Sequence, residues 1–396
     1  MSDYSKYLCI FGGGAVRGYA YLGVLRAFEE VGFYPEKLAG SSVGAVFAAF
    51  YALDIPLKEM EKIFVDVNFE LFRDINFNFG PAFSISKGGV FLDWLKDIIE
   101  KFYYKENYQK GKNPPVCFKD LKRDLMLVTT DITNAVPFIF SKEKTPDYEV
   151  ATAIRASASL PGLLTPVRYE DKLLTDGDLM KGNPLWRLDK ELCPEDLRIL
   201  ELRLEGIKKD NNIKNLLDYF NTVYSCITKY STDYIIDMYA QKDKFDYIKI
   251  DTKDLLLVNF NINDETKEKL GMLGYDAAMK FFRHDLPQKQ KLLAEYYDKL
   301  YKKVEELERN IIKDDTKKAK IVLGELFELL ADVKKLIDSG IYKKITKFKN
   351  LFNENLFCGF WWREKLKEKR KIKKEIAAIK EILSQKHTEF YKKGNL

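Results

Sequence analysis

The chain has 396 residues and a net charge of +6, and 46% of its residues are hydrophobic and 32% charged. This composition supports a buried core and excludes a disordered polyelectrolyte, while the length fits one large domain with an extension. No run approaches the roughly 18 apolar residues of a membrane-spanning helix, and the start lacks the basic and apolar regions of a secretion signal. We therefore expect a cytoplasmic protein.

The spacing of the cysteines and the distribution of charge further limit which classes of protein fit the sequence. The cysteines are scattered without a C-x-x-C pair, so we expect neither a disulfide framework nor a zinc site. Residues 301–396 hold 25 Lys and Arg against 15 Asp and Glu, whereas residues 1–300 hold 41 against 45. The basic character therefore belongs to the C-terminal part.

Taken in chain order, the first elements alternate between strands and helices. Residues 7–11 are an apolar run that ends in glycines, which predicts a buried strand, and helical spacing predicts a helix over 19–31. A strand over 37–40, a turn over 41–44 and an apolar, buried helix over 45–53 follow. Further expected strands are Leu125–Thr130, Val136–Phe140, Leu173–Thr175, Ile199–Leu204 and Tyr247–Ile250.

This alternation predicts an α/β fold with a largely parallel sheet that is covered on both faces. After about residue 285 the sequence changes to long helical patterns rich in Lys and Glu, with no expected strand. We place a boundary near Leu286-Pro287. The expected domains are thus residues 5–285 and a Lys-rich helical region over 286–396.

Gly40-Ser41-Ser42-Val43-Gly44 is a G-x-S-x-G sequence between an expected strand and helix. A sharp strand-to-helix turn exposes a serine hydroxyl above a sheet, and glycines on both sides let the backbone pass closely. The motif alone also fits an ordinary loop. The apolar helix that follows it favours Ser42 as a nucleophile.

A second glycine-rich loop, Gly12-Gly13-Gly14-Ala15-Val16-Arg17-Gly18, follows the first expected strand. It matches neither the dinucleotide-binding nor the P-loop pattern. Converging N–H groups in such a loop can hold a phosphate or the oxyanion of an acyl-transfer intermediate. A glycine turn with a solvent-facing Arg17 is the alternative without a function.

A serine nucleophile needs a base, and the chain has only two histidines, His284 and His387, neither of them in a segment that resembles a catalytic loop. Asp176 is the other candidate, since it ends an apolar strand in the sequence Leu173-Leu174-Thr175-Asp176-Gly177-Asp178. Active groups of α/β sheets gather at strand ends. Asp-Gly is also a common turn dipeptide, so the residue alone does not decide between base and turn.

Together these motifs resemble the patatin-like phospholipase family over about residues 5–285. The matches are the glycine loop with Arg17, the elbow with Ser42, the pair Asp176-Gly177, and the small-residue block at 151–166. The resemblance implies a three-layer α/β/α fold and a Ser–Asp dyad without histidine. It also implies an oxyanion site formed by Gly12, Gly13, Gly14, Ala15 and Arg17, and no metal or organic cofactor.

The resemblance leaves several roles open. The family usually has Gly or Ala where this chain has Asp178, which either raises the pKa of Asp176 or points to solvent; we favour the solvent-facing alternative. Arg17 either orients the loop or meets a lipid phosphate. Ser157 and Ser159 are rival nucleophiles without flanking glycines, and we expect them to pack near the site.

Residues 357–371 combine aromatic side chains with clustered Lys and Arg, as an interfacial membrane segment does. The alternative is a helical hairpin whose aromatic residues pack on the catalytic domain. Nucleic-acid binding is less favoured, because interspersed Glu residues weaken the positive field. The oligomeric state is not readable from the sequence.

We accordingly expect a hydrolase of phospholipids or other lipid esters, acting through Ser42 and Asp176 with an acyl-enzyme. An acyltransferase, a neutral-lipid hydrolase on the same dyad and a catalytically silent lipid-binding module are the alternatives. Peripheral contact with a membrane is the partner interaction that residues 357–371 predict.

Overall fold

The computed structural model describes residues 7–67, 84–180, 197–206, 244–252, 262–313, 315–332, 341–348 and 366–394, with the isolated residues 213, 219, 222, 223 and 226. The chain divides into two compact units. The first consists chiefly of residues 3–240 and 245–280, and the second chiefly of residues 281–396.

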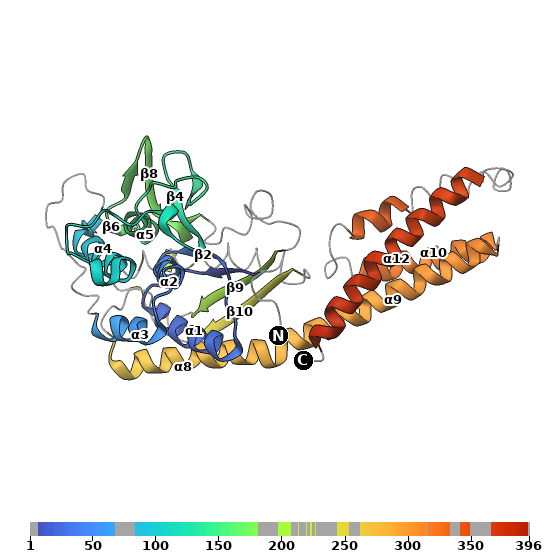
Figure 1. Ribbon diagram of the computed structural model, residues 1–396, viewed down its shortest axis with the longest axis horizontal. Helices are drawn as coiled ribbons and strands as arrows, with labels where there is room; N and C mark the ends of the chain where they lie inside the picture. The colour runs from blue at the N-terminus through green and yellow to red at the C-terminus, as the bar shows by residue number, and fades with distance from the viewer. Residues whose placement is uncertain are drawn as a thin grey trace. The chain divides into compact units, whose positions relative to one another are not determined.

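The first unit is built on a mixed β-sheet with mostly parallel strands (Figure 1). Five strands run parallel in the order β10-β9-β1-β2-β4. They are β1 (Tyr7–Phe11), β2 (Lys37–Ser41), β4 (Asp124–Asp131), β9 (Arg198–Glu205) and β10 (Phe245–Asp251). The predicted largely parallel sheet is confirmed.

Three further strands of this sheet are antiparallel to their neighbours. They are β5 (Val136–Ser141), β7 (Val167–Tyr169) and β8 (Lys172–Asp176). β4 and β5 must run antiparallel because only a short turn joins them, and Asp131 holds that turn by accepting the N–H of Thr133 at 2.9 Å. A separate pair, β3 (Ser84–Ser86) and β6 (Gly162–Leu164), is parallel.

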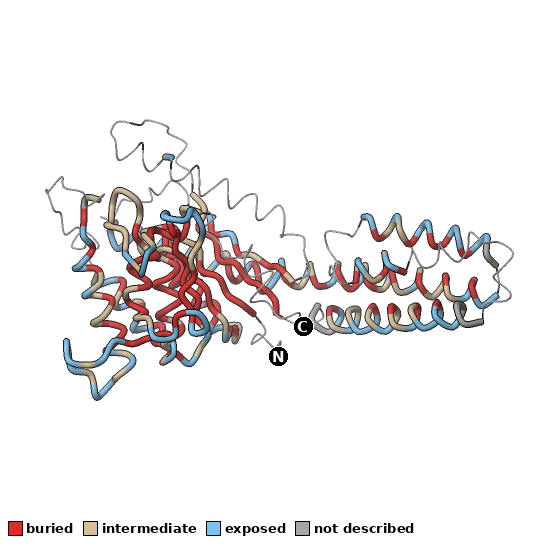
Figure 2. The backbone as a smooth tube through the Cα atoms, turned by 90° about the horizontal axis from the view of Figure 1, so that it is seen from above, coloured by how far each residue is buried: buried red, intermediate tan, exposed pale blue. Residues whose placement is uncertain are grey.

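Both faces of the central strands are buried, as Figure 2 shows by the red strands of this unit. Side chains alternate along a strand, so Leu8 and Ile10 of β1 lie on one face and Cys9 and Phe11 on the other. The first face also contains Ala39, Met126, Val128 and Ile139 in one buried cluster. This is the burial pattern of an α/β fold with layers on both sides of the sheet.

Aromatic contacts pack three helices against the other face, namely α1 (Ala20–Val31), α2 (Val43–Ala52) and α3 (Leu57–Asp66). Tyr21 of α1 contacts Phe11 and Phe47 with ring centroids 5.3 and 5.4 Å apart. Phe47 of α2 stacks on Phe64 of α3 at 4.4 Å. The expected apolar helix after the glycine turn is therefore buried, as its composition predicts. Two more α-helices of the described residues before 180 are α4 (Gly89–Tyr104) and α5 (Val150–Ser157).

A helix that the sequence analysis missed, α8 (Asp264–Lys280), packs directly on α1. The two backbones approach closely at glycines. A Cβ atom on Gly23 would lie 1.7 Å from the carbonyl oxygen of Gly271, and one on Gly274 would lie 1.9 Å from that of Ala20. Backbone atoms cannot move aside, so this packing requires glycine at both positions.

We predict that Gly23→Ala and Gly274→Ala each lower the free energy of unfolding by about 1–3 kcal/mol, because the added methyl group forces the helices apart. Gly271→Ala is the matched control, since a Cβ there meets nothing within 4 Å. Alanine favours a helix interior, so this control should be neutral or stabilise by up to about 1 kcal/mol. Urea denaturation measures all three, and equal effects would contradict the close packing.

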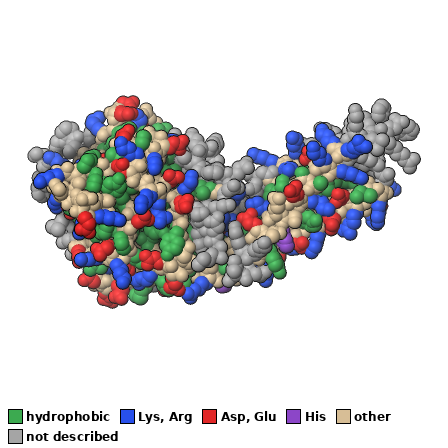
Figure 3. Space-filling view, viewed as in Figure 1, with side chains coloured by type: hydrophobic (Ala, Val, Ile, Leu, Met, Phe, Trp, Pro, Cys, Tyr) green, Lys and Arg blue, Asp and Glu red, His purple; other side chains and the backbone are tan. Residues whose placement is uncertain are grey.

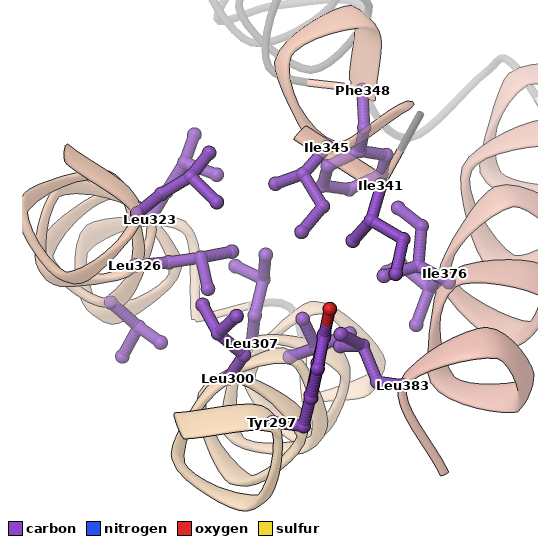
Figure 4. Packing of buried hydrophobic residues seen from close by; sticks show 14 of the residues in the cluster. Tyr297, Leu300, Leu307, Leu323, Leu326, Ile341, Ile345, Phe348, Ile376 and Leu383 are labelled. Carbon is purple, nitrogen blue, oxygen red and sulfur yellow. The ribbon is translucent and has the colours of Figure 1, made fainter. Parts of the chain in front are cut away.

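The second unit is a helical bundle with its own hydrophobic core (Figure 4). Its helices are α9 (Leu286–Ile312), α10 (Thr316–Asp332), residues 341–348 and α12 (Leu366–Gly394), preceded by a π-helix at Phe281–Asp285. Core positions recur at helical spacing, as in Leu293, Leu300, Val304 and Leu307 of α9. The bundle buries the apolar face of α12, including Ile372, Ile376, Ile379 and Leu383.

The expected boundary at Leu286-Pro287 lies within consecutive helical residues. Pro287 is in the first turn of α9, where a helix does not use the N–H group that proline lacks. The aromatic residues at 357–362 lie outside the described residues, and only 366–371 of the expected interfacial segment belong to a described helix, α12. In the described part of the chain, no helix is both long enough and apolar enough to cross a bilayer.

Candidate active site

Ser42 lies at the sharp turn between β2 and α2. Its backbone has φ 52° and ψ −128°, a conformation that a residue with a side chain rarely adopts. A Cβ on Gly44 would lie 2.1 Å from the carbonyl oxygen of Phe11, and one on Gly40 would lie 2.5 Å from that of Gly44. Both glycines of the G-x-S-x-G sequence are thus required by close backbone contacts. Strain held at one serine by such contacts points to a functional site.

Ser157 fastens this turn to the sheet. Its hydroxyl accepts the Ser42 N–H at 3.0 Å and donates to the carbonyl oxygen of Val128 at 2.6 Å. Ser159 is equally buried, and its hydroxyl accepts from Arg155 at 2.6 Å and donates to the Arg155 carbonyl at 2.8 Å. Both rival serines are buried and use their hydroxyl groups in structural hydrogen bonds, in agreement with the packing role that we expected for them.

The register of the sheet brings Asp176 close to Ser42. On one side of β4, Val128 pairs with Ser41, and on the other side the next residue, Thr129, pairs with Asp176. With strands about 4.8 Å apart, the backbones of Ser42 and Asp176 lie about 10 Å apart across β4. A Cβ on Gly177 would lie 3.1 Å from Cβ of Ser41, so the Asp-Gly pair lies against the turn that contains Ser42.

Asp176 is fully buried, and its main chain is held on both sides. The Thr130 hydroxyl donates to its carbonyl at 2.9 Å, and its N–H donates to the Ser159 carbonyl at 3.0 Å. Its Oδ1 accepts the N–H of Asp178 at 2.9 Å. The Asp176 side chain therefore makes the hydrogen bond of an Asp-Gly turn, which was one of the two alternatives for this residue. The same residue also lies beside the elbow.

Asp178 does not point to solvent, and our preferred interpretation of it was wrong. The residue is 9% exposed, and its carboxyl group accepts hydrogen bonds from the Ser41 hydroxyl and the Gly13 N–H. Burial, followed by the negative charge of Asp176, raises the pKa of Asp178 to about 8, against the opposing effects of Ser41, Arg17 and Gly13. A like charge and desolvation both favour the protonated carboxyl group.

The glycine loop is held from several directions. The Gly12 N–H donates to the Leu202 carbonyl at 3.1 Å, and the buried Tyr21 hydroxyl donates to the Gly12 carbonyl at 2.7 Å. Arg17 is 7% exposed and donates to the carbonyl oxygens of Gly14 at 3.3 Å and Gly206 at 3.2 Å. These contacts favour the first of its two expected roles, orienting the loop.

Neither histidine is in the unit that contains Ser42. His284 contacts Asp285 and Gln288 at 3.2 Å each, and the ring of His387 stacks on Tyr391. Among the described cysteines, Cys9, Cys117 and Cys226 are free thiols. The described residues contain no group of three or more His, Cys, Asp or Glu side chains arranged to hold a metal ion.

Several residues that shape the site were missed by sequence reasoning. Tyr21 contacts Gly12, and no local motif marks it. Thr130 contacts Asp176 and lies in the weakly family-like sequence Thr129-Thr130-Asp131, but the sequence assigned it no role at the site. Arg155 lies 3% exposed in the small-residue block and donates to the carbonyl oxygens of Lys87 at 2.6 Å and Thr165 at 3.0 Å. A charged residue in an otherwise small and apolar stretch was the one available signal.

Comparison with models of protein families finds a match to the patatin-like phospholipase family over residues 9–189. This range includes the glycine loop, the elbow and the Asp-Gly pair. Residues 9–189 belong to the patatin-like phospholipase family. The matched stretch ends before β9, β10 and α8, which complete the first unit around this patatin-like domain.

Relatives of the patatin-like domain differ in how much of their length they share with this chain. The uncharacterized protein YqhO of Bacillus subtilis (strain 168) is 25% identical over 288 residues, covering 67% of this chain and 94% of YqhO. Lysophospholipase NTE1 of Kluyveromyces lactis is 28% identical over 187 residues, covering 46% of this chain and 12% of NTE1.

A solved structure supports the fold. VipD from Legionella pneumophila matches with a TM-score of 0.55 and 15% identity, covering 96% of this chain and 90% of VipD. At that identity the likeness concerns the fold alone. It agrees with a patatin-like α/β fold followed by a helical region.

We predict that Asp178→Asn changes the pH dependence of stability. The folded protein keeps the Asp178 proton to about pH 8, whereas an unfolded chain releases it near pH 4. Between these values the folded state binds more protons, so this residue lowers stability as pH rises. The melting temperature of Asp178→Asn relative to the parent should therefore increase steadily from pH 5 to pH 8.

Differential scanning fluorimetry across that range is the measurement. Asp276→Asn on the exposed surface of α8 makes the same substitution at a solvated position and serves as the control. A difference in melting temperature that stays constant with pH would show that Asp178 titrates normally.

Proposed function

We propose that the chain is a lipid acyl hydrolase in which Ser42 is the nucleophile and Asp176 is the base. The observation that carries this proposal is the strained Ser42 turn, held by glycines that touch Phe11 and Gly44 and placed across β4 from the buried Asp176. Lipid ester hydrolysis is the activity that the family match supports. The catalytic domain that we propose spans residues 5–285.

In the proposed reaction, the Ser42 hydroxyl attacks the ester carbonyl while Asp176 takes its proton. Asp176 then passes the proton to the leaving alcohol, and an acyl-enzyme remains on Ser42. Water attacks that ester with the same carboxylate as base, which releases the fatty acid and restores Ser42. The chemistry needs no metal ion or organic cofactor.

The oxyanion of each tetrahedral intermediate needs aimed N–H donors. Among the loop residues proposed for this role, Gly12 donates to Leu202 and Gly13 to Asp178. We therefore assign the oxyanion contacts to the N–H groups of Gly14 and Ala15. Ala15 has φ 48°, and Arg17 holds the Gly14 carbonyl, so the loop conformation in this stretch is fixed before substrate binds.

The substrate class that we favour is a phospholipid or lysophospholipid. The name of the NTE1 relative describes a lysophospholipase. The family match, which describes a phospholipase, covers the glycine loop, the elbow and the Asp-Gly region that carry the proposed chemistry. Acyl transfer to another alcohol and neutral-lipid hydrolysis would use the same dyad. Profiling the released products by lipid class discriminates among them.

We predict that Ser42→Ala and Asp176→Asn each lower fatty-acid release from lysophosphatidylcholine by about 10⁴-fold, because removing one member of a nucleophile–base pair disables both. Controls of matched chemistry are Ser384→Ala on the exposed surface of α12 and Asp276→Asn on α8, which should keep the parent rate. Release that survives either active-site change would refute the dyad. A silent lipid-binding module would show no release with the parent protein.

We also propose that residues 357–371 bring the enzyme to anionic membranes. Arg370 and Lys371 are exposed at the described end of this segment, while the apolar face of α12 is buried in the bundle. Figure 3 shows further Lys and Arg side chains over the visible face of the helical unit. Cationic side chains beside anionic headgroups each contribute about 1 kcal/mol.

Reversing both charges with Arg370→Glu and Lys371→Glu should weaken binding to phosphatidylglycerol-containing vesicles by about 30-fold or more, since two favourable contacts are lost. Co-sedimentation with vesicles measures this. Lys317→Glu with Lys318→Glu on the exposed surface of α10 changes net charge equally and should weaken binding less. Equal losses in the two double variants would assign the attraction to overall charge and not to this segment.

A further inference from the structure

The carboxyl group of Asp178 contacts two of the three segments that form the proposed active site, and its backbone contacts the third. The Ser41 hydroxyl, next to the nucleophile, donates to Oδ1 of Asp178. The Gly13 N–H of the glycine loop donates to the same carboxyl group. The Asp178 N–H donates to Oδ1 of Asp176 at 2.9 Å. One residue therefore connects the elbow, the loop and the base.

Two glycines, Gly13 and Gly177, leave the room that the Asp178 carboxyl group needs for these contacts. A Cβ on Gly13 would lie 1.6 Å from Oδ2 of Asp178, so the carboxyl oxygen occupies the position of a side chain at residue 13. A Cβ on Gly177 would lie 2.3 Å from the Val128 carbonyl. The absence of side chains at both glycines lets the segment after β8 approach β4 and lets Asp178 reach the loop.

We propose that Asp178 is a positioning residue of the ester-cleaving site, which holds the glycine loop and the Ser42 turn in their reactive arrangement. The inference rests on the proposed function and extends it, because Asp178 belongs neither to the dyad nor to the oxyanion donors. An asparagine at this position keeps one accepting oxygen and replaces the other with a donating NH2 group, so it cannot accept from the Ser41 hydroxyl and the Gly13 N–H through separate oxygens.

The charged and titratable groups that face Asp178 set its protonation. Burial and the charge of Asp176 raise the pKa of Asp178, and the charge of Arg17 lowers it. The buried Tyr21 lies close enough for the charge of Asp178 to raise the pKa of its hydroxyl. With a pKa of about 8, Asp178 stays protonated at neutral pH. Above that pH, ionised Asp178 adds a negative charge beside the loop that must stabilise the oxyanion. The reaction should then slow.

The test is the rate at which a fluorophosphonate ester labels Ser42 in the full-length protein from pH 5 to pH 10, followed by intact mass. This probe forms a bond from the Ser42 oxygen to phosphorus with loss of fluoride and needs no lipid surface. For the parent we expect a rate that falls above about pH 8. For Asp178→Asn we expect no such fall, because the side chain cannot ionise.

At pH 7, Asp178→Asn should also lower kcat for a soluble ester by about 10- to 100-fold, with a smaller change in KM, since hydrogen bonds to the loop and elbow are weakened. Asp276→Asn is the matched control and should retain both the rate and the pH profile. An Asp178→Asn variant that labels with the pH profile of the parent would overturn the proposal.

Ser41→Ala provides a second variant in case Asp178→Asn does not fold. The Ser41 hydrogen bond favours the ionised form of Asp178, so its loss should shift the alkaline decline to higher pH. A decline at the position seen in the parent would contradict the inference. Labelling of Ser42→Ala at the parent rate would instead refute the proposed function, so the two failures are distinguishable.

Discussion

The other features of the site depend on a close backbone contact at Gly44. Gly44, at the start of α2, lies against the carbonyl oxygens of Phe11 and Gly12, with no room for a side chain. This contact joins the end of β1, the glycine loop and the turn that contains Ser42 at one point. It stabilises Ser42 in a backbone conformation that is unfavourable for a residue with a side chain. The hydroxyl of Ser157 connects the same turn to β4 by hydrogen bonds.

Two buried carboxyl groups, those of Asp176 and Asp178, lie close together beside that contact. Asp176 and Asp178 are linked through the backbone N–H of Asp178. The carboxyl group of Asp178 accepts from Ser41 and Gly13, and the positive charge of Arg17 lies close to it. Burial and the negative charge of Asp176 both raise the pKa of Asp178, which favours the protonated form of this second carboxyl group at neutral pH.

Specific stretches show why much of the fold was predictable. The strand at Tyr7–Phe11 and the helix after Ser42 are both almost wholly apolar, and this local pattern predicts that each is buried in the core. The sequence analysis missed α8, because it packs through Gly23 and Gly274, and a glycine contact between helices has no hydrophobic periodicity of its own. The antiparallel direction of β8 was likewise not predicted, since strand direction depends on the path of the connecting chain.

Taken alone, the sequence determined the chemistry that is available: a serine between glycines, a glycine loop, an Asp-Gly pair and no well-placed histidine. These are properties of residue type and local spacing, and they sufficed to indicate the family. Only the tertiary structure decided that Asp178 is buried against Gly13 and Ser41 and that Arg17 holds the loop. Burial and hydrogen bonding between segments more than 130 residues apart in sequence depend on how the strands pair, which no local pattern encodes.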